Sequence, residues 1–204
     1  MMQDRRFWDR YARVYDLVTR PGNTELAAAA EWIAGFLNPH DRLLDAACGT
    51  GTFACALAPR VESVMACDYS SEMIARACRK ASRARLRNIA FRVEDVTRLD
   101  LPTGAFDAAV CANVLHLLNS PADAVAELKR VLRPGGLLIA PNYVQEPKSH
   151  SRRMRLVRKA GFAFAQDWNA PAFEDFLSGQ GLRVLDSRLF DAWQPLDVVV
   201  CRSH

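Results

Sequence analysis

A carboxylate and two closely spaced glycines stand where the first apolar run of the chain ends. Asp45 closes the run, and Gly49 and Gly51 follow with one residue between them. Glycine lets the backbone approach a ligand closely, and a helix that starts after such a loop presents unpaired N–H groups. The pattern therefore predicts a loop that binds a nucleoside-containing cofactor.

Two kinds of cofactor fit this loop. The run from Gly49 to Ala54 matches the dinucleotide pattern G-x-G-x-x-G/A, and Asp68 follows at about the distance of a ribose-binding acid. Sites for S-adenosylmethionine (SAM) also combine a glycine loop with an acid after the second strand. Asp45 favours SAM, because its carboxylate can bind an amino-acid ammonium group, whereas a pyrophosphate gains nothing from a negative charge.

The elements that must position these residues alternate between short apolar runs and helical patterns. This alternation is typical of a parallel sheet covered on both faces. About six residues join the last two runs, too few for a helical crossover, so that pair should be antiparallel. We therefore expect an α/β, Rossmann-like, seven-stranded, mostly parallel sheet with an antiparallel terminal strand. The expected strands are 42–47, 61–67, 89–94, 106–111, 136–141, 182–189 and 196–202.

Helix signals lie between the runs. Ser70 and Ser120 stand at expected caps, and Pro121 fits a first turn. We expect one domain over 1–204, with an N-terminal helical cap over 1–38. A substrate-side insertion is expected over 142–170, because ligands of open α/β sheets bind outside the carboxyl ends of the strands.

Composition excludes several classes. The net charge of +4 does not indicate nucleic-acid binding, and no apolar run approaches membrane-spanning length. The polar start predicts a cytoplasmic protein. The six cysteines lack metal-ligand spacing, which predicts reduced core thiols and no metal site.

A basic run over 148–159 contains six lysines and arginines. Such a run is typical of a solvated helix face, and it also suits an anionic substrate or a membrane surface. Aromatic residues at 162, 164 and 168 suggest an apolar or amphipathic acceptor, with peripheral membrane contact through 148–164.

Five motifs carry a family resemblance: YARVYD at 11–16, LDAACGTG at 44–51, DYSSEM at 68–73, FDAAV at 106–110 and VLRPGG at 131–136. With these motifs the chain resembles the class I SAM-dependent methyltransferases of the small-molecule type. It is similar to the group that contains the ubiquinone/menaquinone C-methyltransferases. The resemblance implies SAM as cofactor and S-adenosylhomocysteine (SAH) as product.

The resemblance also implies residue roles. Asp68 would bind both ribose hydroxyls, Tyr69 would pack on adenine, and Asp95 and Val96 would meet the adenine edge. The remaining cofactor-binding positions surround the methionine part and the methyl group, and they are Tyr11, Tyr15, Asp45, Ala47, Cys48, Gly49, Gly51, Cys111, Ala112 and Asn113.

One position departs from the family pattern. Ala47 stands where the family usually has glycine. We expect alanine to be tolerated, because a strand end needs only an ordinary backbone conformation. A positive φ at this position would instead weaken SAM binding.

Methyl transfer from a sulfonium is a displacement that removes positive charge from sulfur, so holding the nucleophile in line matters most. We predict His116 as the base for acceptors that must lose a proton, and Tyr15 as an aromatic lid over the sulfonium. His116, Asn142 and Tyr143 are predicted to contact the acceptor. Strand four ends in Cys-Ala-Asn-Val, which lacks the motif of nucleobase amine methyltransferases and favours a small-molecule acceptor.

Two other functions remain open at this point. One is a SAM-binding regulatory protein without catalysis, and the other is an NAD-dependent oxidoreductase.

Overall fold

The computed structural model describes residues 5–19, 23–145, 165–191 and 194–203. The basic run 148–159, the proposed membrane-contacting stretch 148–164 and most of the expected insertion 142–170 lie outside these residues.

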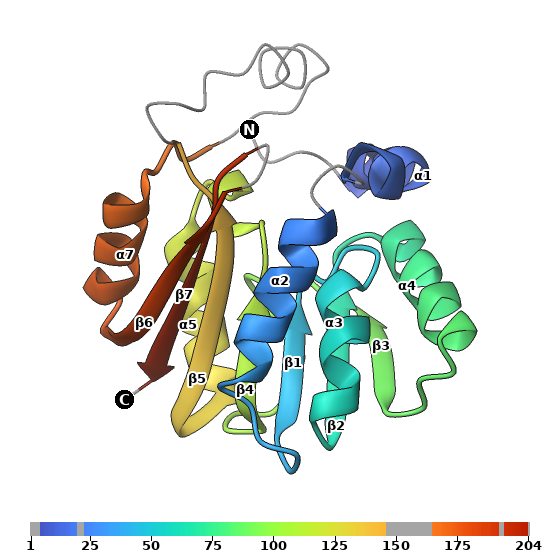
Figure 1. Ribbon diagram of the computed structural model, residues 1–204, viewed down its shortest axis with the longest axis horizontal. Coiled ribbons are helices and arrows are strands. Elements are labelled where there is room, and N and C mark those ends of the chain that lie inside the picture. Colours follow the sequence, from blue (N-terminus) through green and yellow to red (C-terminus); the bar gives the residue numbers. More distant parts are fainter. Residues whose placement is uncertain (1–4, 20–22, 146–164, 192–193, 204) are drawn as a thin grey trace.

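Seven strands form one sheet in the order β3-β2-β1-β4-β5-β7-β6, as Figure 1 shows. The first five strands run parallel, and β7 is antiparallel to both of its neighbours. The predicted α/β fold is confirmed. The reversed strand lies second from the edge, however, and β6 forms the edge itself. The strands are β1 (Arg42–Ala46), β2 (Ser63–Asp68), β3 (Ile89–Val93), β4 (Phe106–Cys111), β5 (Leu132–Tyr143), β6 (Leu182–Phe190) and β7 (Leu196–Ser203).

Strand β5 starts earlier than the sequence indicates. The expected strand begins at 136, but Leu132 already pairs with Phe106, and the register then shifts. Gly136 lies so close to strand β4 that an added Cβ would come within 3.0 Å of the Asp107 carbonyl oxygen. The absence of a side chain at Gly136 therefore lets β5 pair closely with β4.

Helices cover both faces of the sheet. On one face lie α2 (Asn23–Ala34), α3 (Thr52–Leu57) and α4 (Ser71–Arg83), and on the other lie α5 (Pro121–Val131) and α7 (Ala170–Gly179), as in Figure 1. Alternate strand residues supply the two cores, because successive side chains point to opposite faces. Leu43 and Val110 belong to the core under α2 and α3, whereas Leu44 and Ala109 belong to the core under α5 and α7.

Short 3-10 turns lie at Ala58–Arg60 and Leu115–Leu117. Helix α1 (Arg5–Thr19) lies near α4, outside the carboxyl ends of the strands (Figure 1). Ser70 caps α4, because its hydroxyl accepts a hydrogen bond from the Met73 N–H at 3.2 Å. Ser120 occupies the cap position of α5 without a side-chain cap bond.

None of the described helices has the length and apolar character that crossing a membrane requires. All six cysteines are free, and the residues described contain no cluster of three or more potential metal ligands. Burial raises the pKa of the Cys67 and Cys201 thiols to about 12, so neither is a thiolate near neutral pH.

Candidate functional site

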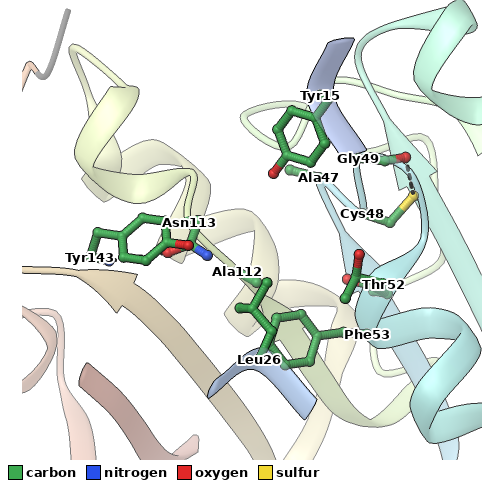
Figure 2. A pocket seen from close by; sticks show the side chains of 11 residues that line it. Tyr15, Leu26, Ala47, Cys48, Gly49, Thr52, Phe53, Ala112, Asn113 and Tyr143 are labelled. Carbon is green, nitrogen blue, oxygen red and sulfur yellow. Dashed lines mark hydrogen bonds between the residues drawn. The ribbon is translucent and has the colours of Figure 1, made fainter. Parts of the chain in front are cut away.

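A pocket with about 450 Å³ of free volume, part of it open to solvent, lies at the carboxyl ends of β1, β4 and β5. Figure 2 shows its two sides: the loop after β1 forms one, and the ends of β4 and β5 form the other. Its lining residues are Tyr15, Leu26, Asp45, Ala47, Cys48, Gly49, Thr52, Phe53, Ala112, Asn113 and Tyr143.

Asp45 supplies a buried carboxyl group to this pocket. Its side chain is only 1% exposed, and one carboxylate oxygen accepts a hydrogen bond from the Ala54 N–H at 2.8 Å. The other oxygen, Oδ1, is buried without a hydrogen-bond partner. Burial raises the pKa of Asp45 to about 7, the Ala54 N–H opposes this shift, and the charge of Asp68 adds to it. An unpartnered carboxylate oxygen in such a pocket is suited to a cationic group.

The loop after β1 turns through left-handed backbone conformations. Ala47 has φ 56°, Gly49 has φ 54° and Gly51 has φ 77°. The expectation of an ordinary conformation at Ala47 is therefore wrong. Alanine is strained here because its Cβ crowds the following carbonyl, which explains why glycine is the residue that suits this position.

Gly51, which was predicted to bind the cofactor, is needed for helix packing. It does not line the pocket, and a Cβ at this position would come within 3.0 Å of the Ala77 Cβ on α4. Its missing side chain therefore lets α3 and α4 pack together.

Asp68 holds the same loop from the neighbouring strand. Its two carboxylate oxygens accept hydrogen bonds from the N–H groups of Gly49 at 2.8 Å and Ser70 at 2.9 Å. Burial raises the pKa of Asp68, and these two N–H donors oppose the shift. Each oxygen retains a second lone pair that can accept a further hydrogen bond.

Helix α1 lies over the glycine loop. The Tyr15 ring lies close to Gly49, since a Cβ built on Gly49 would be 3.9 Å from the ring. Nearby, the Thr50 hydroxyl donates to the Asp16 carboxylate at 2.6 Å. At the other end of α1 the Ser70 hydroxyl donates to Asp9 at 2.5 Å. These contacts hold the Tyr15 ring against the pocket, and its role as a lid over the sulfonium stays a prediction.

The opposite wall is a hydrogen-bonded unit at the ends of β4 and β5. Asn113 has φ 54°, its N–H donates to the Pro141 carbonyl at 2.7 Å, and its side-chain oxygen accepts from the Tyr143 N–H at 3.1 Å. Asn142 donates to the Tyr143 carbonyl at 3.1 Å, and its side-chain oxygen lies 2.7 Å from His116 Nδ1. The backbone of Tyr143 is therefore held on both sides.

His116 and Asn142 do not line the pocket, and their contact with the acceptor stays a prediction. Both side chains are almost completely buried, at 2% and 1% exposure. Burial lowers the pKa of His116 to about 4, against the opposing effects of Asn142 and Asp167, so the imidazole is neutral near pH 7.

Sequence reasoning found most of the lining residues and missed three. Leu26, Thr52 and Phe53 line the pocket from the start of α2 and the first turn of α3. The position of Thr52 and Phe53 directly after the glycine loop could have indicated them. Nothing local indicates Leu26, because α2 reaches the pocket only through tertiary packing.

The other predicted cofactor residues lie outside the pocket lining. Cys111 is buried in the core under α5, and Tyr11 packs edge-on against Tyr15. Tyr69 is 37% exposed, and Val96 is buried. Asp95 accepts hydrogen bonds from the N–H and hydroxyl of Thr97, at 2.9 and 2.7 Å.

Comparisons with known proteins agree with this geometry. The Methyltransferase domain family matches residues 44–140. Demethylmenaquinone methyltransferase of Beutenbergia cavernae is 35% identical over 143 residues, which cover 69% of this chain and 58% of that protein. The chain spans about half the length of the curated relatives it matches.

Among solved structures, a SAM-dependent methyltransferase from Aquifex aeolicus superposes with a TM-score of 0.71 at 20% identity, covering 90% of this chain and 94% of that one. The [4+2]-cyclase SpnF superposes with a TM-score of 0.72 at 20% identity, covering 87% and 80%. The fold is thus shared by a methyltransferase and a cyclase.

The fold, the glycine loop and the family match over residues 44–140 show that the chain contains a methyltransferase domain and resembles the class I SAM-dependent methyltransferases. The residues present fit the cofactor of that class. Asp45 offers an unpartnered buried oxygen for an ammonium group, and Tyr15 offers an aromatic face beside the loop.

Proposed function

We propose that the protein transfers a methyl group from SAM to a small-molecule acceptor by in-line displacement. The observation that carries the proposal is the buried Oδ1 of Asp45, which lacks a partner in a pocket beside the glycine loop. A cationic amino-acid group would supply that partner. A dinucleotide pyrophosphate would add like charge, which argues against the NAD-dependent alternative.

The chain's own residues would hold the cofactor along the ends of β1 and β2. Asp45 and the backbone of Ala47, Cys48 and Gly49 would bind the methionine part, and Asp68 would accept hydrogen bonds from the ribose hydroxyls. Tyr69, Asp95 and Val96 stay the proposed adenine-binding residues. SAM supplies an electrophilic methyl group on a sulfonium, and the faces of Tyr15 and its neighbours suit that positive charge.

Positioning carries most of the proposed catalysis, because no large new charge forms in the transition state. The apolar side chains of Leu26 and Phe53 and the ring of Tyr143 would confine the acceptor opposite the cofactor. We propose that His116 acts through Asn142, which holds the Tyr143 backbone. Proton transfer by the His116 ring itself stays a prediction that the pH dependence of the rate tests.

The division of the chain and its location also stay proposals. We propose a single domain over 1–204, with α1 and α2 as a cap over the site and acceptor contacts from 142–170. Cytoplasmic location and peripheral membrane contact through 148–164 are likewise predictions. Liposome flotation of the purified protein tests the membrane contact, and failure to float with anionic vesicles would contradict it.

Calorimetry with SAH and NAD in parallel tests the cofactor. We expect SAH to bind wild-type protein and NAD to show no binding, and Asp45→Asn should weaken SAH binding. A radiolabelled-methyl screen across phenols, thiols, amines and quinone precursors then tests transfer. SAH binding without turnover of any acceptor would favour the regulatory alternative over catalysis.

A further inference from the structure

A second carboxylate lies next to the pocket lining, at the start of α2. Glu25 directly precedes Leu26, which lines the pocket. The Oε2 atom of Glu25 is buried without a hydrogen-bond partner. Buried carboxylate oxygens are normally hydrogen-bonded, because loss of hydration is otherwise uncompensated.

The helix alone does not account for this arrangement. Glu25 belongs to the first turn of α2, where the helix dipole favours a negative charge. The helix dipole explains why an acidic residue stands at this position, but an exposed side chain would serve it equally well. The helix dipole gives no reason for burying an oxygen atom without a hydrogen-bond donor. A ligand that carries such a donor would supply the missing hydrogen bond.

The charge of Glu25 acts on the wall of the pocket that faces away from the glycine loop. Burial, with added contributions from Glu25 and Tyr11, raises the pKa of Tyr143 to about 12. Tyr143 extends into the pocket from the end of β5, across from Tyr15 (Figure 2). Glu25 is half-buried and is not itself a lining residue, but its neighbour Leu26 and Tyr143 both line the pocket. The charge of Glu25 therefore acts on the side left for the acceptor once Asp45 and Gly49 hold the cofactor.

We propose that Glu25 is an acceptor-binding residue, whose carboxylate accepts a hydrogen bond from a hydroxyl or amine group of the methyl acceptor beside Tyr143. This inference rests on the proposed methyltransferase function and names the acceptor class. A group that carries a proton supplies the donor that Oε2 lacks. A carboxylate or phosphate in the same place is repelled by Glu25, so anionic acceptor groups are selected against.

Binding of a matched pair of small aromatic probes tests this selection. In ¹⁹F NMR titrations of the SAH-saturated protein at pH 7, 4-fluorophenol presents a hydroxyl group and 4-fluorobenzoate presents a carboxylate on the same ring. Glu25→Gln removes the charge and keeps the side-chain shape. Glu31→Gln is the matched control, because Glu31 lies on the same helix and makes an exposed ion pair with Arg60 at 2.9 Å.

We expect wild-type protein and Glu31→Gln to bind 4-fluorophenol more tightly than 4-fluorobenzoate. Glu25→Gln should weaken 4-fluorophenol binding by about tenfold, the size expected for a lost hydrogen bond to a charged group, and should strengthen 4-fluorobenzoate binding. SAH affinity, measured by calorimetry in each variant, should stay unchanged.

Several results would overturn the proposal. One is a phenol-to-benzoate preference that stays unchanged in Glu25→Gln, or that changes in Glu31→Gln as much as in Glu25→Gln. Another is that neither probe binds the wild-type SAH complex. A third is that Glu25→Gln loses SAH affinity as much as it loses 4-fluorophenol affinity. Failure of wild-type protein to bind SAH is a different outcome, because it rejects the methyltransferase proposal as well.

Discussion

The carboxylate of Asp68 accepts a hydrogen bond from the backbone N–H of Gly49 at 2.8 Å. The acid at the end of β2 thus shapes the glycine loop that follows β1. In the sequence the two residues are only separate parts of a motif. In the fold, Asp68 supports the loop and also keeps lone pairs for a ribose hydroxyl.

Replacing Asp68 with alanine should therefore have two effects. SAH affinity should fall by about 1–3 kcal/mol, because charged hydrogen bonds to the ligand and the support of Gly49 are lost together. Thermal stability should fall as well. Calorimetry and thermal unfolding measure these effects, with Asp100→Ala, an exposed acid, as control. Unchanged SAH affinity would show that the ribose assignment is wrong.

SAH binding should depend on pH through Asp45. The ammonium group of the ligand favours the ionised carboxylate, and the pKa of Asp45 in the ligand-free protein is about 7. Affinity should therefore rise with pH up to about 7, and below that pH it should fall by about tenfold per pH unit. Asp45→Asn should bind weakly and without this slope. Equal slopes in both proteins, measured by calorimetry from pH 5 to 8, would contradict the assignment.

Asp45 should also influence the stability of the ligand-free protein. Its folded pKa is raised above the ordinary value of 3.8, so the folded state holds its proton to higher pH than the unfolded state does. The free energy of unfolding should therefore decrease as pH rises from about 4 to about 7. Asp45→Asn removes this contribution, whereas Asp68, whose pKa is also raised, retains its own. Denaturant unfolding across this range measures the difference between the two proteins.

Ala47→Gly should stabilise the protein. Ala47 has φ 56°, and glycine relieves the left-handed strain at this position. This relief should exceed the entropy that glycine adds to the unfolded chain, so the free energy of unfolding should rise by about 0.5–1 kcal/mol. SAH affinity should be retained or improved. Ala46→Gly, in regular strand β1, is the matched control and should destabilise. Destabilisation by both substitutions in denaturant titrations would show that Ala47 is not strained.

Thr50→Val should loosen the cap formed by α1. The substitution keeps the side-chain shape and removes the hydroxyl that donates to Asp16 at 2.6 Å. SAH should dissociate several-fold faster, because the loss of a charge-assisted hydrogen bond is worth about 1 kcal/mol or more. Stopped-flow displacement measures the rate. Thr103→Val removes an exposed hydroxyl that accepts a hydrogen bond from Arg130 at 3.3 Å, away from the pocket, and should leave dissociation unchanged. Equal rates in all three proteins would contradict a capping role for α1.

The rate of methyl transfer should not change between about pH 5 and 8 through titration of His116, because the pKa of His116 lies near 4. His116→Ala should raise the KM of the acceptor without weakening SAH binding, since His116 supports Tyr143 through Asn142. His40→Ala removes an exposed histidine and should change neither. A rate limb near pH 6.5 that disappears only in His116→Ala would instead support proton transfer by this ring.

The sequence by itself determined the sheet, the loop and the cofactor class. These features depend on local patterns: apolar runs of strand length, the acid and glycines from Asp45 to Gly51, and a cap at Ser70. The short join before β7 even predicted the reversed strand, because six residues cannot carry a crossover helix.

Only the tertiary structure decided how these residues serve the site. It placed Gly51 against Ala77, gave Ala47 a left-handed conformation and buried His116 behind Tyr143. It also left Glu25, next to the lining residue Leu26, with a buried carboxylate oxygen that has no hydrogen-bond partner. Burial, backbone strain and the orientation of a side chain depend on neighbours from distant segments, and a local sequence pattern does not contain them.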